Sequence, residues 1–308
     1  MSNSDTRPVL VAGATGKQGG AVVRALLQAG RPVRAMTRDP ASSAGQTLAA
    51  PGVEVVKGDF NDIASLDAAM AGVAGVFSMQ MPSQPSAPET EVTTGKALID
   101  AADRAGVDTV VHTSVARAGD QKSFVGWDEG RWDPVYWNEK AAVIEMVKAK
   151  GFRHWTVLKP ALIMENLIPP MVNFMFPAVG DRGLLESAIN TDTRLDWIAA
   201  TDIGAFAAAA FADPERFHGQ EIDLAAECTT LSDIAYKLTK ATGRPVSAVA
   251  LSRDEMLEKG YDPRHVQSHE WDNVEGYKVD LAAVRRWGVP LTTLDEFVKQ
   301  NRNKFVIG

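Results

Sequence analysis

The stretch VLVAGATGKQG, residues 9–19, is a short apolar run that leads into three glycines, Gly13, Gly16 and Gly19, spaced three residues apart. This pattern predicts a strand, a tight turn and the start of a helix. Glycine allows a positive φ in such a turn and lets a pyrophosphate approach the main chain, and the helix start offers unpaired N–H groups. The expected ligand is therefore a dinucleotide. Because many strand-to-helix turns carry glycines, the rest of the chain has to supply the specificity.

Composition and charge narrow the class of protein. The chain has 308 residues, 45% of them hydrophobic, which is enough for a globular protein with a large core. A net charge of -7 argues against a nucleic-acid partner. Cys228 is the single cysteine, so an intrachain disulfide is excluded and a reducing, cytoplasmic location is expected. The first residues lack the pattern of a secretory signal, and no apolar run approaches the roughly 20 residues of a membrane span, so no membrane partner is expected.

Strand-like and helix-like segments alternate through the first half of the chain, which predicts an α/β fold with a doubly wound parallel sheet of the Rossmann type. The expected strands and helices are 9–12, 19–29, 32–37, 42–49, 53–57, 63–71, 76–79, 89–105, 109–113, 137–150 and 155–159. Segments at 203–212, 221–224, 231–242 and 294–301 are expected to follow. We therefore predict a dinucleotide-binding domain over residues 1–160, to which elements near 195–225 return, and a smaller α/β substrate-binding region over 161–308.

The residues after the second expected strand bear on the cofactor. An acidic residue about 20 positions after the glycine motif would bind both ribose hydroxyls of NAD, but the strand ends in Met36-Thr37-Arg38. Arg38 and Lys17 place two cations where a 2′-phosphate would lie, so NADP(H) is preferred. Asp39 keeps NAD(H) open, and the alternative is that both cations are ordinary surface residues.

The third expected strand is followed by Asp59 and Phe60, which could bracket an adenine. A plain turn before the next helix, capped by Asn61 or Asp62, is the competing interpretation.

Four motifs together carry a family resemblance. GATGKQG after the first strand, TRDP after the second, GDFND after the third and the later LKPALIMEN resemble the NmrA-like family of atypical short-chain dehydrogenases/reductases, over essentially the whole chain. The resemblance implies a Rossmann fold, a smaller carboxy-terminal domain and a nicotinamide dinucleotide in the cleft. That family contains redox sensors that bind the dinucleotide without turning it over, as well as reductases of quinones, phenylpropanoids and other carbonyl or alkene substrates.

Tyr136 and Lys140 decide between these activities. A spacing of four places both side chains on one helix face, so the ammonium can hold the nicotinamide ribose and lower the pKa of the phenol, which can then protonate a carbonyl oxygen. The pair resembles the YxxxK pair of catalytic short-chain reductases, and Ser114, or else Thr113, matches the serine that orients the substrate oxygen. The alternative is that Tyr136 anchors a helix start after Pro134.

Aromatic and methionine side chains in three segments are expected to line a flat, apolar substrate such as a quinone or polycyclic aromatic ketone. The alternative is that they pack the domain junction or the contact of a homodimer. The expected substrate contacts are Met81, Trp127, Trp132, Met164 and Asn166. The full set of expected cofactor contacts is Gly13, Thr15, Gly16, Lys17, Gln18, Gly19, Arg38, Asp59, Phe60, Met79, Gln80, Thr113, Lys140 and Pro160.

Other titratable residues are not expected to form a site. His265 and His269 have a spacing that could serve a metal, but a third firm ligand is missing and their polar neighbourhood favours a solvated helix. Glu139 is interpreted as part of the wet face of its helix, and His112 as buried beside Ser114.

The sequence therefore predicts an NAD(P)H-binding oxidoreductase that uses Tyr136, Lys140 and Ser114 to reduce a carbonyl, quinone or polycyclic aromatic substrate by hydride transfer. The rivals are a non-catalytic NAD(P)H sensor and a dinucleotide-dependent oxygenation or modification of an aromatic substrate.

Overall fold

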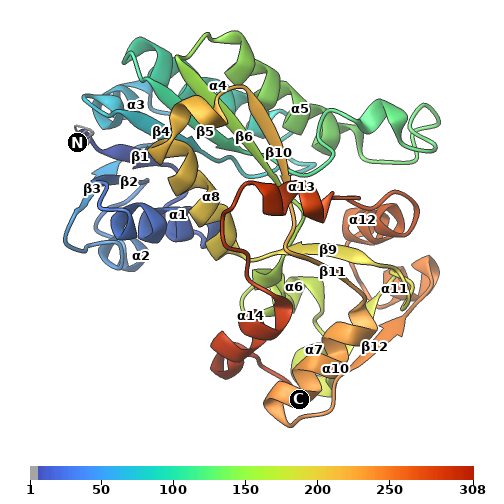
Figure 1. Cartoon of the computed structure of the whole chain (residues 1–308). Helices are drawn as coiled ribbons and strands as arrows, with labels where there is room; N and C mark the ends of the chain where they lie inside the picture. The colour runs from blue at the N-terminus through green and yellow to red at the C-terminus, as the bar shows by residue number, and fades with distance from the viewer. Residues whose placement is uncertain (1–5) are drawn as a thin grey trace. The chain divides into compact units, whose positions relative to one another are not determined.

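The structure is a computed structural model that describes residues 6–308, and it divides into two units (Figure 1). The first unit contains the amino-terminal part of the chain up to Gly119, together with Val135–Lys159 and Ala200–Ile222. The second contains Asp120–Pro134, Pro160–Ala199 and Asp223–Gly308.

A seven-stranded sheet forms the centre of the first unit, in the order β10-β6-β5-β4-β1-β2-β3. Its strands are β1 (Val9–Val11), β2 (Val33–Thr37), β3 (Val53–Lys57), β4 (Gly75–Ser78), β5 (Thr109–Thr113), β6 (His154–Pro160) and β10 (Gln220–Leu224). Its helices are α1 (Lys17–Gln28), α2 (Ser43–Gln46), α3 (Ile63–Met70), α4 (Thr90–Arg104), α5 (Pro134–Ala149), α8 (Ala200–Ala212) and α9 (Pro214–Phe217). β1 pairs in parallel with both β2 and β4, so the strand order reverses between β1 and β4. In open α/β sheets a ligand binds outside the carboxyl ends of the strands at such a reversal.

One face of this sheet buries an apolar core under α3, α4 and α5 (Figure 1). Val76 on β4 and Val110 on β5 contribute to it, together with Leu98 on α4 and Val143 on α5. Because strand side chains alternate between faces, the next residues on that face are the last polar positions of these strands. The apolar core therefore ends in a polar layer at the carboxyl edge of the sheet.

The opposite face carries α1 and α8, which pack closely together. Gly204 on α8 permits this approach, because a Cβ atom there would lie 2.6 Å from the carbonyl oxygen of Ala21 on α1. The glycine thus positions α1, the helix that begins at the glycine turn.

The second unit contains two smaller sheets, β11-β9-β7 and β12-β8, with surrounding helices. Its strands are β7 (Leu162–Ile163), β8 (Leu184–Ser187), β9 (Leu195–Ile198), β11 (Glu227–Thr229) and β12 (Ser247–Ala250). Its α-helices are α6 (Val172–Met175), α7 (Val179–Arg182), α10 (Leu231–Thr242), α11 (Arg253–Glu258), α12 (Pro263–Val274), α13 (Leu281–Arg286) and α14 (Leu294–Gln300). The 3-10 helices are η1 (Gln121–Ser123), η2 (Met164–Leu167) and η3 (Arg302–Lys304).

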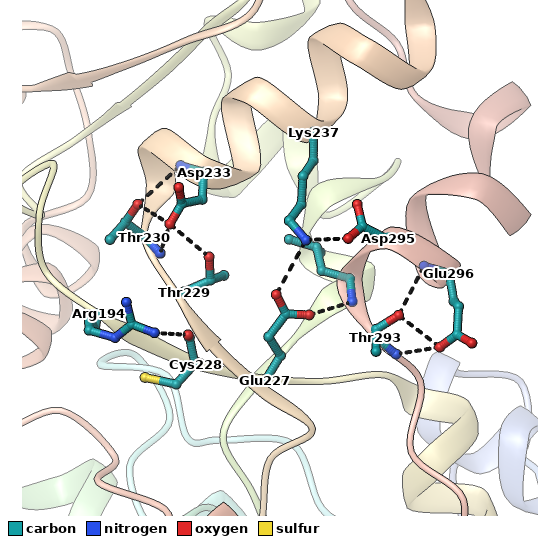
Figure 2. Close-up of polar contacts among 11 residues, drawn as sticks. Arg194, Glu227, Cys228, Thr229, Thr230, Asp233, Lys237, Thr293, Asp295 and Glu296 are labelled. Atoms are coloured by element: carbon teal, nitrogen blue, oxygen red, sulfur yellow. Dashed lines mark hydrogen bonds and ion pairs between the residues drawn. The ribbon is translucent and has the colours of Figure 1, made fainter.

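Polar contacts fasten α10 and α14 to β11 (Figure 2). The ammonium of Lys237 on α10 lies 3.4 Å from a carboxylate oxygen of Glu227 and 2.6 Å from one of Asp295. Glu227 also accepts a hydrogen bond from the backbone N–H of Leu294, 2.8 Å away. Thr230 begins α10 with a reciprocal capping box, which satisfies backbone donors at the helix start.

The doubly wound sheet predicted from the alternating segments is confirmed, and element bounds shift by a few residues. α1 begins at Lys17 rather than residue 19, and α5 begins at Pro134 rather than residue 137, because proline fits the first turn of a helix. Among residues 6–308, no helix is long and apolar enough to cross a membrane.

The expectation that His265 and His269 lie on a solvated helix is wrong. Both are buried, and their rings lie 4.2 Å apart, centroid to centroid. Burial lowers the pKa of His265 and lowers that of His269 to about 3, so His269 is neutral at physiological pH. The two rings pack edge to face, and the Nδ1 atom of His269 lies 3.2 Å from the backbone nitrogen of Ala188. Among residues 6–308, no group of three or more His, Cys, Asp or Glu side chains is arranged for a metal.

Candidate active site

The glycine turn lies between β1 and α1, at the reversal point of the sheet. Gly13 has a φ of +64°, and its carbonyl accepts a hydrogen bond of 2.9 Å from the N–H of Gly16. Gly16 precedes α1 without a side-chain cap. The first backbone N–H groups of α1 therefore have no side-chain acceptor from this residue, which is the arrangement that binds a phosphate.

Close packing explains why Gly13 and Gly19 carry no side chain. A Cβ atom at Gly19 would lie 2.5 Å from the carbonyl carbon of Gly13, and one at Gly13 would lie 2.6 Å from the terminal methyl of Met79. Met79, which directly follows β4, therefore lies against the turn. This contact brings together two of the expected cofactor residues.

Exposed side chains lie beside the turn and after β2. Thr15, Lys17 and Arg38 are exposed. Within residues 6–308, neither Lys17 nor Arg38 forms an ion pair or a side-chain hydrogen bond. Asp39, by contrast, accepts a 2.9 Å hydrogen bond from the N–H of Ala41. The two cations are thus available for an anionic group, while the carboxylate already caps its own turn.

The segment after β3 forms the capped turn that was the competing interpretation. Asp59 accepts a 2.9 Å hydrogen bond from the N–H of Asn61, and Asp62 caps α3 through the N–H of Ser65 at 3.1 Å. Phe60 is half-buried against the apolar core. These contacts account for the segment without a ligand, so a contact of Asp59 or Phe60 with adenine stays a prediction.

Two expected residues join β5 to the start of α1. The hydroxyl of Thr113 donates a 2.9 Å hydrogen bond to the side-chain oxygen of Gln18. Ser114 is buried next to them, and its N–H bonds to the carbonyl of Leu158 at 2.9 Å. Its hydroxyl oxygen has no hydrogen-bond partner among the described residues. A buried hydroxyl without a partner is available to orient a substrate oxygen.

The polar layer above the apolar core includes His112, Ser78 and Gln80. The Nδ1 atom of His112 lies 3.2 Å from the hydroxyl of Ser78, which also accepts a 3.1 Å hydrogen bond from the amide of Gln80. Burial, with a smaller effect from Lys140, lowers the pKa of His112 to about 3. His112 is therefore neutral in this layer, and the expectation that it is buried beside Ser114 is confirmed.

Lys140 forms a buried ion pair that the sequence did not predict. Its ammonium lies 2.7 Å from a carboxylate oxygen of Glu91 on α4, and the exposed fractions of the two side chains are 7% and 2%. Burial raises the pKa of Glu91, and the neighbouring Lys140 opposes that effect. The same ammonium lies 5.7 Å from the ring centroid of Tyr136. Tyr136 is half-buried, and its ring meets that of Trp137 edge to face at 5.2 Å.

Glu139 does not lie on the wet face of its helix, which corrects the sequence interpretation. It is buried, and its carboxylate accepts hydrogen bonds from the hydroxyl of Ser83 at 2.5 Å and from the N–H of Glu89 at 2.8 Å. Ser83 and Glu91 were missed because both partners come from the loop and helix after β4, far from α5 in sequence. The local signal in the sequence was the carboxylate of Glu91 in the first turn of α4, and it does not indicate a partner on α5.

The expected substrate residues fall into both units. Met81 is exposed in the first unit. In the second unit Trp132 and Met164 are almost completely buried, and the indole N–H of Trp132 donates a 2.7 Å hydrogen bond to the carbonyl of Val125, so packing accounts for both. Trp127 and Asn166 are half-buried there, and Pro160 is buried at the end of β6.

The strand order, the glycine turn and the exposed helix start define a dinucleotide-binding Rossmann unit. The chain belongs to the NmrA-like family, whose model matches residues 5–287. It is 31% identical over 248 residues to an NAD(P)H azoreductase of Xenophilus azovorans, covering 80% of this chain and 78% of that protein.

Solved structures agree with this assignment. The NADPH-dependent quinone oxidoreductase of Escherichia coli, crystallised with NADPH, superposes with a TM-score of 0.74 at 25% identity, covering 96% of this chain and 100% of that one. The negative transcriptional regulator NmrA in complex with NAD has a TM-score of 0.73 at 18% identity, covering 96% and 95%. At this identity the regulator shares the fold alone. The family and fold expected from the sequence are confirmed.

Proposed function

We propose that this protein is an NAD(P)H-dependent oxidoreductase that prefers NADP(H) and reduces a small aromatic or quinone-like substrate. The observation that carries the proposal is the arrangement of Lys140 beside the ring of Tyr136 in the unit that holds the glycine turn. A relative that is named an NAD(P)H azoreductase and a structural neighbour that is a quinone oxidoreductase support the same class of reaction.

The residues of the first unit fit a dinucleotide. The turn at Gly13 packs closely against Met79 and carries no side chain, and the helix start at Gly16 offers backbone donors to a pyrophosphate. The cations of Lys17 and Arg38 are exposed and have no partner among residues 6–308, which suits a 2′-phosphate, because guanidinium and ammonium groups bind phosphate by charge-assisted hydrogen bonds. This is why NADP(H) is preferred over NAD(H).

When bound, the dinucleotide supplies the hydride. Lys140 would hold the ribose next to the nicotinamide, and Tyr136 would donate its phenolic proton to the substrate oxygen as the hydride reaches the adjacent carbon. The hydroxyl of Ser114, which lacks a partner among residues 6–308, would hold that oxygen in place. The single cysteine, Cys228, is a free thiol, which suits the cytoplasmic location that we also propose.

Substitution of Tyr136 by Phe tests the proposal. The variant should bind NADPH as tightly as the wild type, measured by fluorescence titration, and should reduce quinones and aromatic ketones about 100-fold more slowly, because general acid catalysis contributes on this order. Trp137→Phe replaces the neighbouring indole by a smaller ring without removing an acid and serves as the control. Unchanged turnover in Tyr136→Phe would refute Tyr136 as the proton donor. No turnover of any quinone or aromatic ketone by the wild type, with NADPH still bound, would leave the non-catalytic sensor as the better explanation. Oxygen consumption coupled to NADPH oxidation would instead indicate oxygenation.

A further inference from the structure

The ion pair between Lys140 and Glu91 lies in an environment where neither charge is solvated. Both side chains are more than nine-tenths buried, and Val143, one turn further along α5, belongs to the apolar core of the first unit. An ammonium in such a place requires a counter-charge, because the loss of hydration is not recovered otherwise. Glu91 supplies this charge from a different helix.

Glu91 is itself held in place by hydrogen bonds. Its backbone N–H donates to the hydroxyl of Ser83 at 2.9 Å, and that hydroxyl donates to the carboxylate of Glu139, which also accepts from the N–H of Glu89. Glu91 is the second residue of α4, where the helix dipole favours a carboxylate. The loop before α4 is therefore fastened to α5 beside Lys140.

This arrangement fixes where the ammonium of Lys140 lies. An ammonium has three N–H donors, and one of them bonds to Glu91. Among residues 6–308, Nζ forms no other hydrogen bond, so two donors remain. A ribose offers two neighbouring hydroxyl oxygens. The bond to Glu91 already restricts the long, flexible side chain of Lys140. Both remaining donors can therefore bind such a diol with little further loss of rotamer freedom.

We propose that Glu91 is a positioning residue for Lys140: it holds the ammonium in the place and orientation from which Lys140 binds the nicotinamide ribose. The proposal rests on the proposed function, because it takes Lys140 as the ribose ligand. It assigns Glu91 no contact with substrate or cofactor, so Glu91 acts only through Lys140.

A double-mutant cycle tests this inference, with the dissociation constant of NADPH as the readout. Glu91→Gln should weaken NADPH binding by about tenfold to a hundredfold, the effect of losing one charged hydrogen-bond partner. Lys140→Met should weaken it at least as much. In the Lys140→Met background, Glu91→Gln should have no further effect, because there is no ammonium left to position.

Two further variants separate positioning from folding. Glu91→Asp keeps the buried charge but shortens the side chain, so it should fold as the wild type does and still bind NADPH several-fold more weakly. Glu145→Gln removes an exposed carboxylate that pairs with Lys148 on the same helix, 2.7 Å away, and should leave NADPH binding unchanged.

The outcomes distinguish the two proposals. If Lys140→Met weakens NADPH binding while Glu91→Gln and Glu91→Asp do not, the positioning role is refuted and the proposed function stands. Equal losses from Glu91→Gln in both backgrounds would also refute it, since Glu91 would then act independently of Lys140. If Lys140→Met and Tyr136→Phe change neither NADPH binding nor quinone reduction, the roles proposed for Lys140 and Tyr136 fail, and the role of Glu91 fails with them. If the wild type reduces no quinone or aromatic ketone with NADPH, the proposed function itself fails.

Discussion

Replacement of Gly19 by alanine should separate the role of the glycine turn from that of helix α1 in general. The new Cβ atom would lie 2.5 Å from the carbonyl carbon of Gly13 and 2.9 Å from the backbone nitrogen of Ala14. Ordinary contacts between such atoms are about 3.5 Å or longer. Because both neighbours are backbone atoms, the turn and the helix start have to separate by roughly 1 Å, which costs about 1–3 kcal/mol of stability.

The larger effect should be on the cofactor. A displacement of roughly 1 Å removes a backbone N–H group from hydrogen-bonding distance of a phosphate oxygen, and a charged hydrogen bond is worth about 1.5–3 kcal/mol. The dissociation constant of NADPH should therefore rise by about tenfold to a hundredfold. Fluorescence titration measures this constant, and urea denaturation of the same preparation measures the change in stability.

Gly20→Ala is a matched control on the next residue of α1. Its Cβ atom would lie 3.3 Å from the carbonyl oxygen of Ala14 and 3.4 Å from a flexible arginine side chain, so only a small adjustment is needed. Alanine is also the better helix former, by about 1 kcal/mol. This variant should bind NADPH as the wild type does. Equal NADPH affinity in Gly19→Ala and Gly20→Ala would show that the close packing of the turn does not govern cofactor binding.

Three further predictions concern cofactor preference, pH and capping. Arg38→Ala should weaken NADPH binding about tenfold and leave NADH binding unchanged, because only the former carries a 2′-phosphate; parallel titrations decide, and an equal loss for both cofactors would contradict the assignment. Burial, aided by Asp196, raises the pKa of Asp272 to about 8 from 3.8. The folded state then binds more protons between these two pH values, so stability falls as pH rises through this window. Asp272→Asn should remove this fall, of which at most about 3 kcal/mol lies between pH 6 and the pKa of about 8, and denaturation at pH 6 and pH 9 measures it; the same slope in wild type and variant would contradict it. Thr230→Ala should cost about 1 kcal/mol of stability in denaturation by breaking the capping box of α10, and an unchanged midpoint would contradict that role.

Local patterns were sufficient to predict the dinucleotide-binding unit. The apolar run before Gly13 and the alternation of strands with helices follow from neighbouring residues, and the strand order then places the turn at the reversal between β1 and β4. The structure differs from the prediction at several helix starts; for example, α1 begins two residues earlier and α5 begins three residues earlier, at Pro134. These features depend on spacings of a few residues, which a sequence displays directly.

Burial was harder to predict, because it depends on what packs against an element. The sequence has polar residues next to Glu139, His265 and His269, and these three side chains were therefore predicted to be exposed to solvent. In the structure the carboxylate of Glu139 accepts hydrogen bonds from Ser83 and from the backbone of Glu89. The two histidines are buried within the second unit. A polar neighbourhood in sequence therefore did not mean an exposed position.

The sequence by itself determined the glycine turn, the doubly wound sheet and the placement of Tyr136 and Lys140 on one helix face, because each is set by contacts within a few residues. Only the tertiary structure decided that Lys140 is buried and that its partner is Glu91, 49 residues away in the chain. The physical reason is that a buried ammonium takes its counter-charge from whichever element folds against it, and no local spacing specifies that element.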